Sequence, residues 1–184
     1  MKLSTQTQTF VSHFGEMSSR WGFNRTVGQM LALLVIHPQP LHADHMADAL
    51  HISRGNVSMG LKELQSWRLI QLKRFPGDRK DYFTAAGTIL EMAKTVFEER
   101  RKREIDPTLS VLRTALLDNA ETEQDKFAHQ QMSELLDLLE HLTEWGQQLN
   151  DLSPAQLQGL MTLGLGVGKV LEFKEKMLGK PSAT

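Results

Sequence analysis

A short polar and basic segment that begins at Ser53 contains the side chains whose types and spacing could do chemistry. Arg54, Ser58 and Lys62 recur at every fourth position, so on a helix they would share one face. In the DNA major groove, an arginine can pair with guanine O6 and N7, and an asparagine with adenine N6 and N7. The candidate contact residues are Ser53, Arg54, Gly55, Asn56, Ser58, Met59 and Lys62. The pattern predicts that this segment recognises a DNA duplex, with Lys62 on a phosphate and the small residues allowing close approach.

A second basic cluster surrounds a turn and consists of Lys73, Arg74, Arg79 and Lys80. The adjacent proline and glycine within 75–78 are typical of a tight turn, and we expect strands at 69–73 and 81–83. A narrow minor groove has an enhanced negative potential that favours an inserted arginine, so Arg79 is the candidate for that position. Alternatively, Asp78 and Arg79 form a local ion pair that stiffens the turn. The two roles are compatible.

Charge is divided unevenly along the chain, although the net charge is only −1. Residues 53–103 carry 12 basic and 6 acidic side chains, whereas residues 104–184 carry 6 basic and 13 acidic ones. A basic block of this kind indicates a polyanionic partner. The run EERRKRE at 98–104 could instead be a solvated helix face, but the window 53–80 alone has 7 basic and 2 acidic residues.

The elements that must position these clusters follow from apolar spacing and helix caps. Apolar residues three and four apart predict helices over 10–21, 27–35 and 43–50. Ser53 is a good N-cap for a fourth helix, and after the hairpin Thr84 is expected to cap a helix that runs to about residue 104. This order is that of a helix-turn-helix followed by a wing. The predicted fold class is mainly α with a small β-hairpin wing, plus a helical dimerisation region.

The last third of the sequence reads as helix throughout. Asp106-Pro107 favours a helix start, since proline is tolerated in the first turn. Leucines then follow a near-heptad spacing through Met132, Leu135, Leu139, Leu142 and Leu149, with Trp145 beside them. The run Ser153-Pro154-Ala155-Gln156 is a capping box, and we expect a final helix to run to about Leu178.

We expect three parts: an N-terminal dimerisation helix at 1–22, a winged helix-turn-helix DNA-binding domain at 23–86, and a helical dimerisation and candidate effector region at 87–184. One such DNA head buries little surface, and dimers gain specificity by reading two half-sites about 34 Å apart. The N-terminal stripe and the leucine-rich helices are therefore predicted to make a homodimer. The alternative is that they pack only within one chain.

Other function classes find little support in the residues. The chain has no cysteine, which excludes disulfides, cysteine-zinc sites and iron–sulfur ligation. The glycines of 164–169 lack the spacing of a phosphate-binding loop and no nucleophile motif is present, so we expect neither an enzyme nor a cofactor. His37, His42, His45 and His51 crowd the DNA head. We expect no metal there, but a metal-responsive regulator stays an alternative, as does an architectural DNA-binding protein without an effector.

Neither a membrane segment nor an export signal is evident. No apolar run approaches the roughly 18 residues that a membrane span needs, and residues 1–9 lack a basic stretch followed by an apolar one. The expected location is therefore the cytoplasm, with no membrane partner.

Four runs of residues resemble a known family. They are Gly22–Gly28 (GFNRTVG), Ser53–Ser58 (SRGNVS), Leu61–Leu64 (LKEL) and Pro76–Phe83 (PGDRKDYF). Together they resemble the GbsR branch of the MarR superfamily, over about residues 5–105. Asp78 and Arg79 are adjacent and precede a short strand, which favours this branch over the wider superfamily with its Asp-x-Arg motif and longer strand. The resemblance implies a homodimeric winged-helix transcriptional regulator, usually a repressor, on a double-stranded DNA operator.

The same resemblance implies a small-molecule effector, because some members respond to choline or related osmolyte precursors. A quaternary ammonium is held by aromatic faces, each worth roughly 0.5–2 kcal/mol. Phe14, Trp21 and Phe23 are the candidate effector-binding residues. The alternative for each of them is packing in the core.

Overall fold

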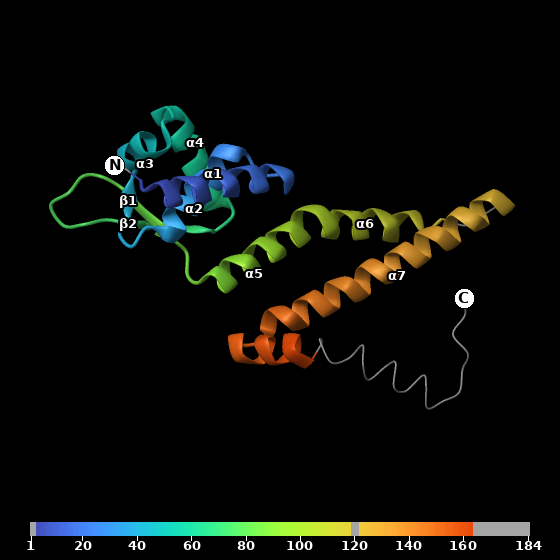
Figure 1. Cartoon of the computed structure of the whole chain (residues 1–184). Helices are drawn as coiled ribbons and strands as arrows, with labels where there is room; N and C mark the ends of the chain where they lie inside the picture. Colours follow the sequence, from blue (N-terminus) through green and yellow to red (C-terminus); the bar gives the residue numbers. More distant parts are fainter. Residues whose placement is uncertain (1–2, 119–121, 164–184) are drawn as a thin grey trace. The chain divides into compact units, whose positions relative to one another are not determined.

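The computed structural model describes residues 3–118 and 122–163 (Figure 1). The chain divides into two compact units, Met1–Arg103 and Glu104–Thr184. In the first unit the elements are α1 (Thr5–Arg20), α2 (Arg25–Ile36), β1 (Leu41–His42), α3 (Ala43–Leu50), α4 (Arg54–Ser66), β2 (Ile70–Lys73), β3 (Tyr82–Ala85) and α5 (Ile89–Arg100). The predicted fold class, mainly helical with a β-hairpin wing, is confirmed.

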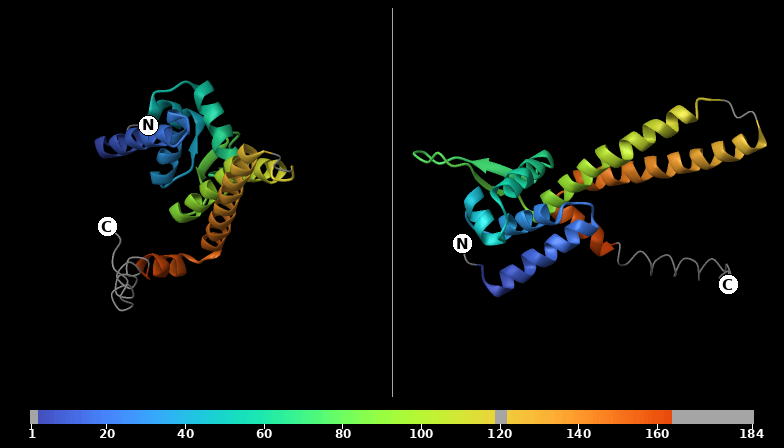
Figure 2. Two further views of the ribbon diagram at one scale, coloured as in Figure 1. Left: turned by 90° about the vertical axis from the view of Figure 1, so that its right-hand side faces the viewer. Right: turned by 90° about the horizontal axis from the view of Figure 1, so that it is seen from above.

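The three strands of the first unit form a small antiparallel sheet in the order β1-β3-β2. Leu41 and Leu72 both pair with Phe83, one from each side. The hairpin of β2 and β3 is the predicted wing, and Figure 2 shows its loop extending beyond the sheet. Gly77, in that loop, has a φ of 83°, a conformation that glycine adopts without the steric cost of a Cβ.

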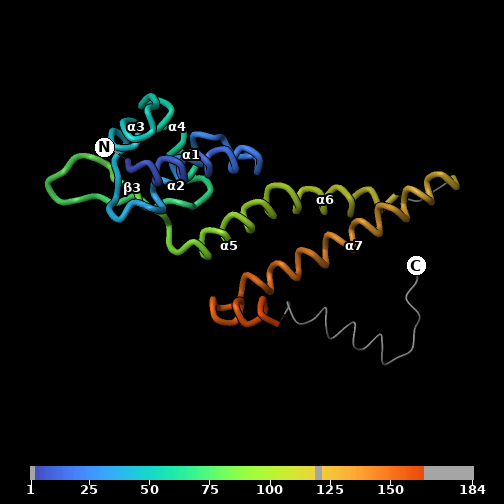
Figure 3. Tube along the Cα trace, in the orientation of Figure 1, coloured from blue at the N-terminus to red at the C-terminus, as the bar shows by residue number. Residues whose placement is uncertain are grey.

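The core of the first unit is built around α2. Met30 and Leu33 are fully buried, and Val57 and Leu64 of α4 and Leu69 join them in the same apolar cluster. α1 lies along α2 (Figure 3), and this contact needs small residues. A Cβ on Gly28 would collide with the buried Ser18 side chain. The glycine therefore sets how closely α1 approaches α2.

One predicted helix cap is wrong. Thr84 lies in β3, and the following helix is capped by Thr88, whose hydroxyl accepts from the Glu91 N–H while Glu91 accepts from the Thr88 N–H. Gly87, with a φ of 99°, separates strand from helix. The Thr-x-x-Glu spacing is the usual capping box, so the signal was present four residues later than predicted. The α-helix itself ends at Arg100, and a π-helical turn (Arg101–Ile105) continues the helical backbone to about the predicted end.

The second unit contains α6 (Asp106–Ala115) and α7 (Glu123–Asp151), which pack against each other. α6 begins at the predicted Asp106-Pro107 start. Arg113 donates two hydrogen bonds to Glu140 across this pair, at 3.1 and 2.6 Å. The buried residues of α6 are Leu109 and Leu112.

The near-heptad leucines of α7 do not form one stripe. Met132, Leu139 and Leu149 are half-buried, whereas Leu135, Leu142 and Trp145 are exposed. Adding the exposed Leu138 completes an apolar stripe at spacings of 3, 4 and 3, which we call the α7 stripe: Leu135, Leu138, Leu142 and Trp145. One helix therefore has both a half-buried and an uncovered apolar face.

The predicted capping box after α7 is formed. The Ser153 N–H donates to Gln156 Oε1 at 2.9 Å, and the Gln156 N–H donates to Ser153 Oγ at 3.3 Å. Residues 154–163 are helical; the rest of the predicted final helix and the glycines of 164–169 lie outside the described residues. Across 3–118 and 122–163, no helix has the length and hydropathy needed to cross a membrane.

Candidate nucleic-acid interface

α4 is fixed on the core by its cap and by one apolar side. The Ser53 hydroxyl accepts a hydrogen bond from the Asn56 N–H at 3.1 Å, which satisfies a donor in the first helical turn. Val57 and Leu64 face the core. Gly60 lets α4 approach α2, since a Cβ there would lie 2.6 Å from Met30 Sδ. Anchoring this side leaves the other side of α4 for solvent.

The solvent side of α4 contains the residues predicted to contact DNA. All of the predicted contact residues on this helix and its cap are exposed: Ser53, Arg54, Gly55, Asn56, Ser58, Met59 and Lys62. Arg54 has an 81% exposed side chain. The solvent side of α4 and its cap thus presents two cations, three small residues, a methionine and an asparagine amide to the surroundings.

Arg54 has a partner that sequence reasoning missed. Its Nε lies 2.8 Å from Oδ1 of Asp44, in the first turn of α3. The second carboxylate oxygen of Asp44 lies 3.7 Å from Nζ of Lys80 on the wing. No local sequence signal marks Asp44 as a partner of Arg54. Its contacts join α3, α4 and the wing.

The wing is stiffened through Asp78, but not by the predicted ion pair with Arg79. Asp78 accepts hydrogen bonds from the Lys80 N–H at 2.9 Å and from the Tyr82 hydroxyl at 2.7 Å. These two hydrogen bonds lower the pKa of Asp78. The pKa of Tyr82 is raised, because its hydroxyl donates to Asp78. Arg79 makes no hydrogen bond or ion pair with any residue that the structure describes. Its guanidinium is therefore available to a ligand at the hairpin tip.

The remaining wing cations differ in how strongly they are engaged. Arg74 Nε donates to Asp81 Oδ1 at 2.9 Å, whereas Lys73 is exposed and forms no ion pair within the described part of the chain. Lys80 is held near Asp44. Lys73 and Arg79 are consequently the wing's freest positive charges.

The histidines of the head do not assemble into a ligand set. The His42 ring stacks on His45 with centroids 3.6 Å apart. Its buried Nδ1 has no hydrogen-bond partner in the described residues and lies 3.7 Å from Asp44. Burial, with the nearby His45 and Lys80, lowers the pKa of His42. His37 is instead bound to the Gln39 backbone at 2.7 Å. Over the described ranges, no three His, Cys, Asp or Glu side chains could hold a metal ion together.

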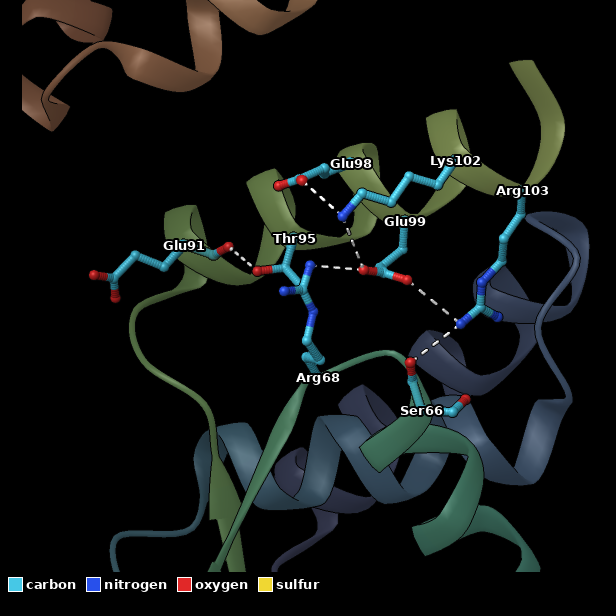
Figure 4. A network of polar contacts seen from close by, with 8 residues as sticks. All are labelled: Ser66, Arg68, Glu91, Thr95, Glu98, Glu99, Lys102 and Arg103. Carbon is cyan, nitrogen blue, oxygen red and sulfur yellow. Dashed lines mark hydrogen bonds and ion pairs between the residues drawn. The ribbon is translucent and has the colours of Figure 1, made fainter. Parts of the chain in front are cut away.

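The acidic and basic run after residue 97 forms a network within the first unit (Figure 4). Glu99, with a side chain only 13% exposed, lies 2.6 Å from Arg68 and 3.5 Å from Arg103. Arg103 also donates to the Ser66 carbonyl at 3.1 Å and lies over the Trp67 ring at 4.1 Å. These cations are engaged with the end of α4, so they do not add to the exposed basic face.

The three candidate effector residues line one cavity. Phe14, Trp21 and Phe23 surround a space of about 440 Å³ in the first unit, together with side chains from α2 and α5. The rings of Phe14 and Trp21 meet edge to face, 6.5 Å apart. Arg100 lies over Phe23 at 5.4 Å. No acidic side chain lines this cavity in the part of the chain that the structure describes.

The segment that holds the helix-turn-helix and wing has a recognisable family pattern. Residues 21–81 match the model of the MarR family. Over this range the chain is similar to the MarR family. All predicted DNA-contact residues of α4 and the wing fall inside the matched range, whereas Phe14 of the cavity lies outside it.

A solved structure described as a transcriptional regulator resembles the chain in fold, with a TM-score of 0.63 and 19% identity, over 79% of this chain and 95% of its own. Two further solved structures match with lower TM-scores. The regulator Tm0710 from Thermotoga maritima has a TM-score of 0.38 and 18% identity, over 76% and 92%. A mutant of MepR from S. aureus, bound to an oligodeoxyribonucleotide, has a TM-score of 0.37 and 17% identity, over 72% and 90%. No curated protein matches the chain in sequence.

Proposed function

We propose that the chain is a sequence-specific DNA-binding transcriptional regulator that acts as a homodimeric repressor. The observation that carries this proposal is the exposed face of α4, which lies beside a wing whose tip arginine has no partner within the described residues. The MarR-type match over 21–81 supports the same conclusion. Kinship with the GbsR branch is part of the proposal and rests on the sequence runs alone.

In this proposal α4 enters the major groove and the wing follows the adjacent minor groove. The terminal nitrogens of Arg54 would donate to O6 and N7 of a guanine, and the Asn56 amide would pair with N6 and N7 of an adenine. Lys62, on the same exposed face, would meet a phosphate, and the capped N-terminus of α4 would attract another. Arg79 would enter the narrow groove, where its charge is attracted whatever the exact base sequence. Occupying an operator in this way would obstruct transcription.

Two arginine variants test the proposal on duplexes that the full-length protein selects from a random pool. Arg54→Ala is expected to relax the preference at one base position by about 1–3 kcal/mol. Arg79→Ala is expected to weaken binding to selected and unselected duplexes to a similar degree. Binding is measured by fluorescence anisotropy after sequencing the selected DNA.

Lys126→Ala is the control, because this α7 cation is already paired with Glu123 at 2.6 Å and lies in the second unit. It should bind DNA like the wild type. An equal loss on every sequence for Arg54→Ala would reduce Arg54 to a phosphate contact. Selection that enriches no motif would favour the architectural alternative.

A small effector is the second part of the proposal, and the aromatic cavity is its candidate site. A choline-like cation would be held by the faces of Phe14 and Trp21 rather than by a carboxylate. Its affinity is expected to exceed that of 3,3-dimethylbutan-1-ol, the uncharged carbon analogue of choline, by roughly 2–30-fold, the range that cation–π attraction supplies. Titrations followed by tryptophan fluorescence and by release of the selected duplex measure this ratio.

Phe14→Leu should remove most of the preference for choline, while Phe127→Leu, an exposed aromatic in α7, should leave it intact. Equal affinity for choline and its uncharged analogue would contradict a cationic effector.

A further inference from the structure

The carboxylate of Asp44 occupies a junction between three parts of the candidate interface. It belongs to the first turn of α3 and its side chain is 37% exposed. Oδ1 lies 2.8 Å from Arg54 Nε, and Oδ2 lies 3.7 Å from Lys80 Nζ. The two oxygens therefore engage the recognition helix and the wing at the same time, which restricts rotation of the carboxylate.

The nitrogen that Asp44 engages determines what Arg54 can still do. A guanidinium has one Nε–H and two terminal NH₂ groups, arranged as a rigid planar fork. Because Asp44 lies at Nε, the terminal groups stay free on an 81% exposed side chain. A guanine offers two acceptors, O6 and N7, that match a pair of parallel donors. The contact thus lies at Nε and leaves unused the donors that a base pair would need.

The Asp44 carboxylate is paired mainly with Arg54 and Lys80. His42 is the remaining basic side chain within 4 Å, but its burial and its neighbours His45 and Lys80 lower its pKa. Beside the carboxylate, a hollow of about 340 Å³ is lined in part by Ser58, Lys62 and Lys80. The carboxylate therefore lies at the face that would meet DNA, not behind it.

We propose that Asp44 is a positioning residue for base recognition, which holds Arg54 with its terminal nitrogens directed outward. This proposal rests on the proposed DNA-binding function. A carboxylate this close to a duplex is repelled by phosphates, so Asp44 lowers affinity for DNA in general. Asp44 also raises the discrimination between the correct and the incorrect base pair. An arginine that is already ordered loses less conformational freedom when it binds the correct base.

The test is a double-mutant cycle on full-length protein, with duplexes that differ only at the base pair that Arg54 reads. Asp44→Asn keeps the shape of the side chain and removes its charge. It is expected to reduce the preference for the correct base roughly 3–30-fold, within the range of couplings between contacting residues. In an Arg54→Ala background the same substitution should change the preference no further.

Asp48→Asn is the matched control, because Asp48 is an exposed acid one turn later on α3 and contacts neither Arg54 nor Lys80 in the structure. It should keep the wild-type base preference. An acid in the first turn of α3 also interacts favourably with the helix dipole, so Asp44→Asn could lower stability. Thermal unfolding of the variant, measured by circular dichroism, distinguishes such a loss of stability from a change in base preference.

Three results would reject the proposal. In the first, Asp44→Asn strengthens binding to all duplexes equally and leaves the base preference intact, which would make Asp44 a simple counter-charge. In the second, the loss of preference persists in the Arg54→Ala background. In the third, the wild type enriches no motif at all, which rejects the proposed function along with this inference. In the first two results the wild type still selects a motif, so the proposed function survives.

Discussion

Binding of the selected duplex is expected to weaken about a thousandfold when the salt concentration rises from about 50 to about 200 mM. Lys62, Lys73 and Arg79 are exposed and form no ion pair within the described residues, so they are the cations most ready to displace counterions. Two copies would supply six such contacts, the lower end of a range for which losses of roughly 10³–10⁵ are typical. Fluorescence anisotropy over a salt series gives the slope of log affinity against log salt.

Arg79→Ala should make this slope shallower by about two, because each cation that neutralises duplex charge contributes roughly 0.9 and the proposed dimer loses the minor-groove arginine in each copy. Lys102→Ala provides the comparison, since its ammonium lies 2.8 Å from Glu98 and belongs to the network at the end of α4. It should leave the slope unchanged. An affinity that is flat across the salt series would contradict phosphate contacts by α4 and the wing.

Replacing Leu138 and Leu142 with glutamate is expected to produce a monomer that binds the operator about 100–10,000-fold more weakly. Their side chains are 55% and 51% exposed at the centre of the α7 stripe. An apolar stripe of this spacing is typical of helices that pair with another helix. The affinity falls because two linked heads bind two half-sites far more tightly than one head binds one. Light scattering checks the mass, and anisotropy with a two-half-site duplex checks the binding.

The control for added charge is Ser133→Glu with Gln147→Glu, two exposed positions of α7 outside the stripe. This variant should remain a dimer. A wild type with the mass of one 20.8 kDa chain, or a stripe variant that stays dimeric with full affinity, would contradict dimerisation through α7.

Local signals explain why the helix-turn-helix and wing could be predicted. Ser53 caps α4, and the proline and glycine at 75–78 form the wing turn, since each signal acts within about four residues. The apolar spacing of 27–35 likewise predicted α2, which the structure extends to Arg25–Ile36. Caps, turns and periodicity do not depend on the rest of the fold. The wrong helix cap arose because Thr84 and Thr88 both lie before the helix, and the prediction took the first of the two threonines.

Contacts between distant residues could not be predicted in this way. Asp44 and Arg54 are ten positions apart, and only the turn between α3 and α4 brings them together. The run 98–104 had the composition of a solvated face, but Glu99 is withdrawn toward Arg68, which is 31 residues away. The charges of a sequence indicate a polyanion partner, whereas their availability depends on the carboxylates that the fold places beside them.

The grip of Arg103 on the end of α4 has a mechanical consequence. This guanidinium accompanies the Arg68–Glu99 ion pair, holds the Ser66 carbonyl and covers the Trp67 ring, so the end of α4 is tied both to α5 and to the turn that follows it. Residues of α5, among them Met92 and Val96, also form a wall of the aromatic cavity. One helix therefore borders the cavity with one part and contacts the end of α4 with another.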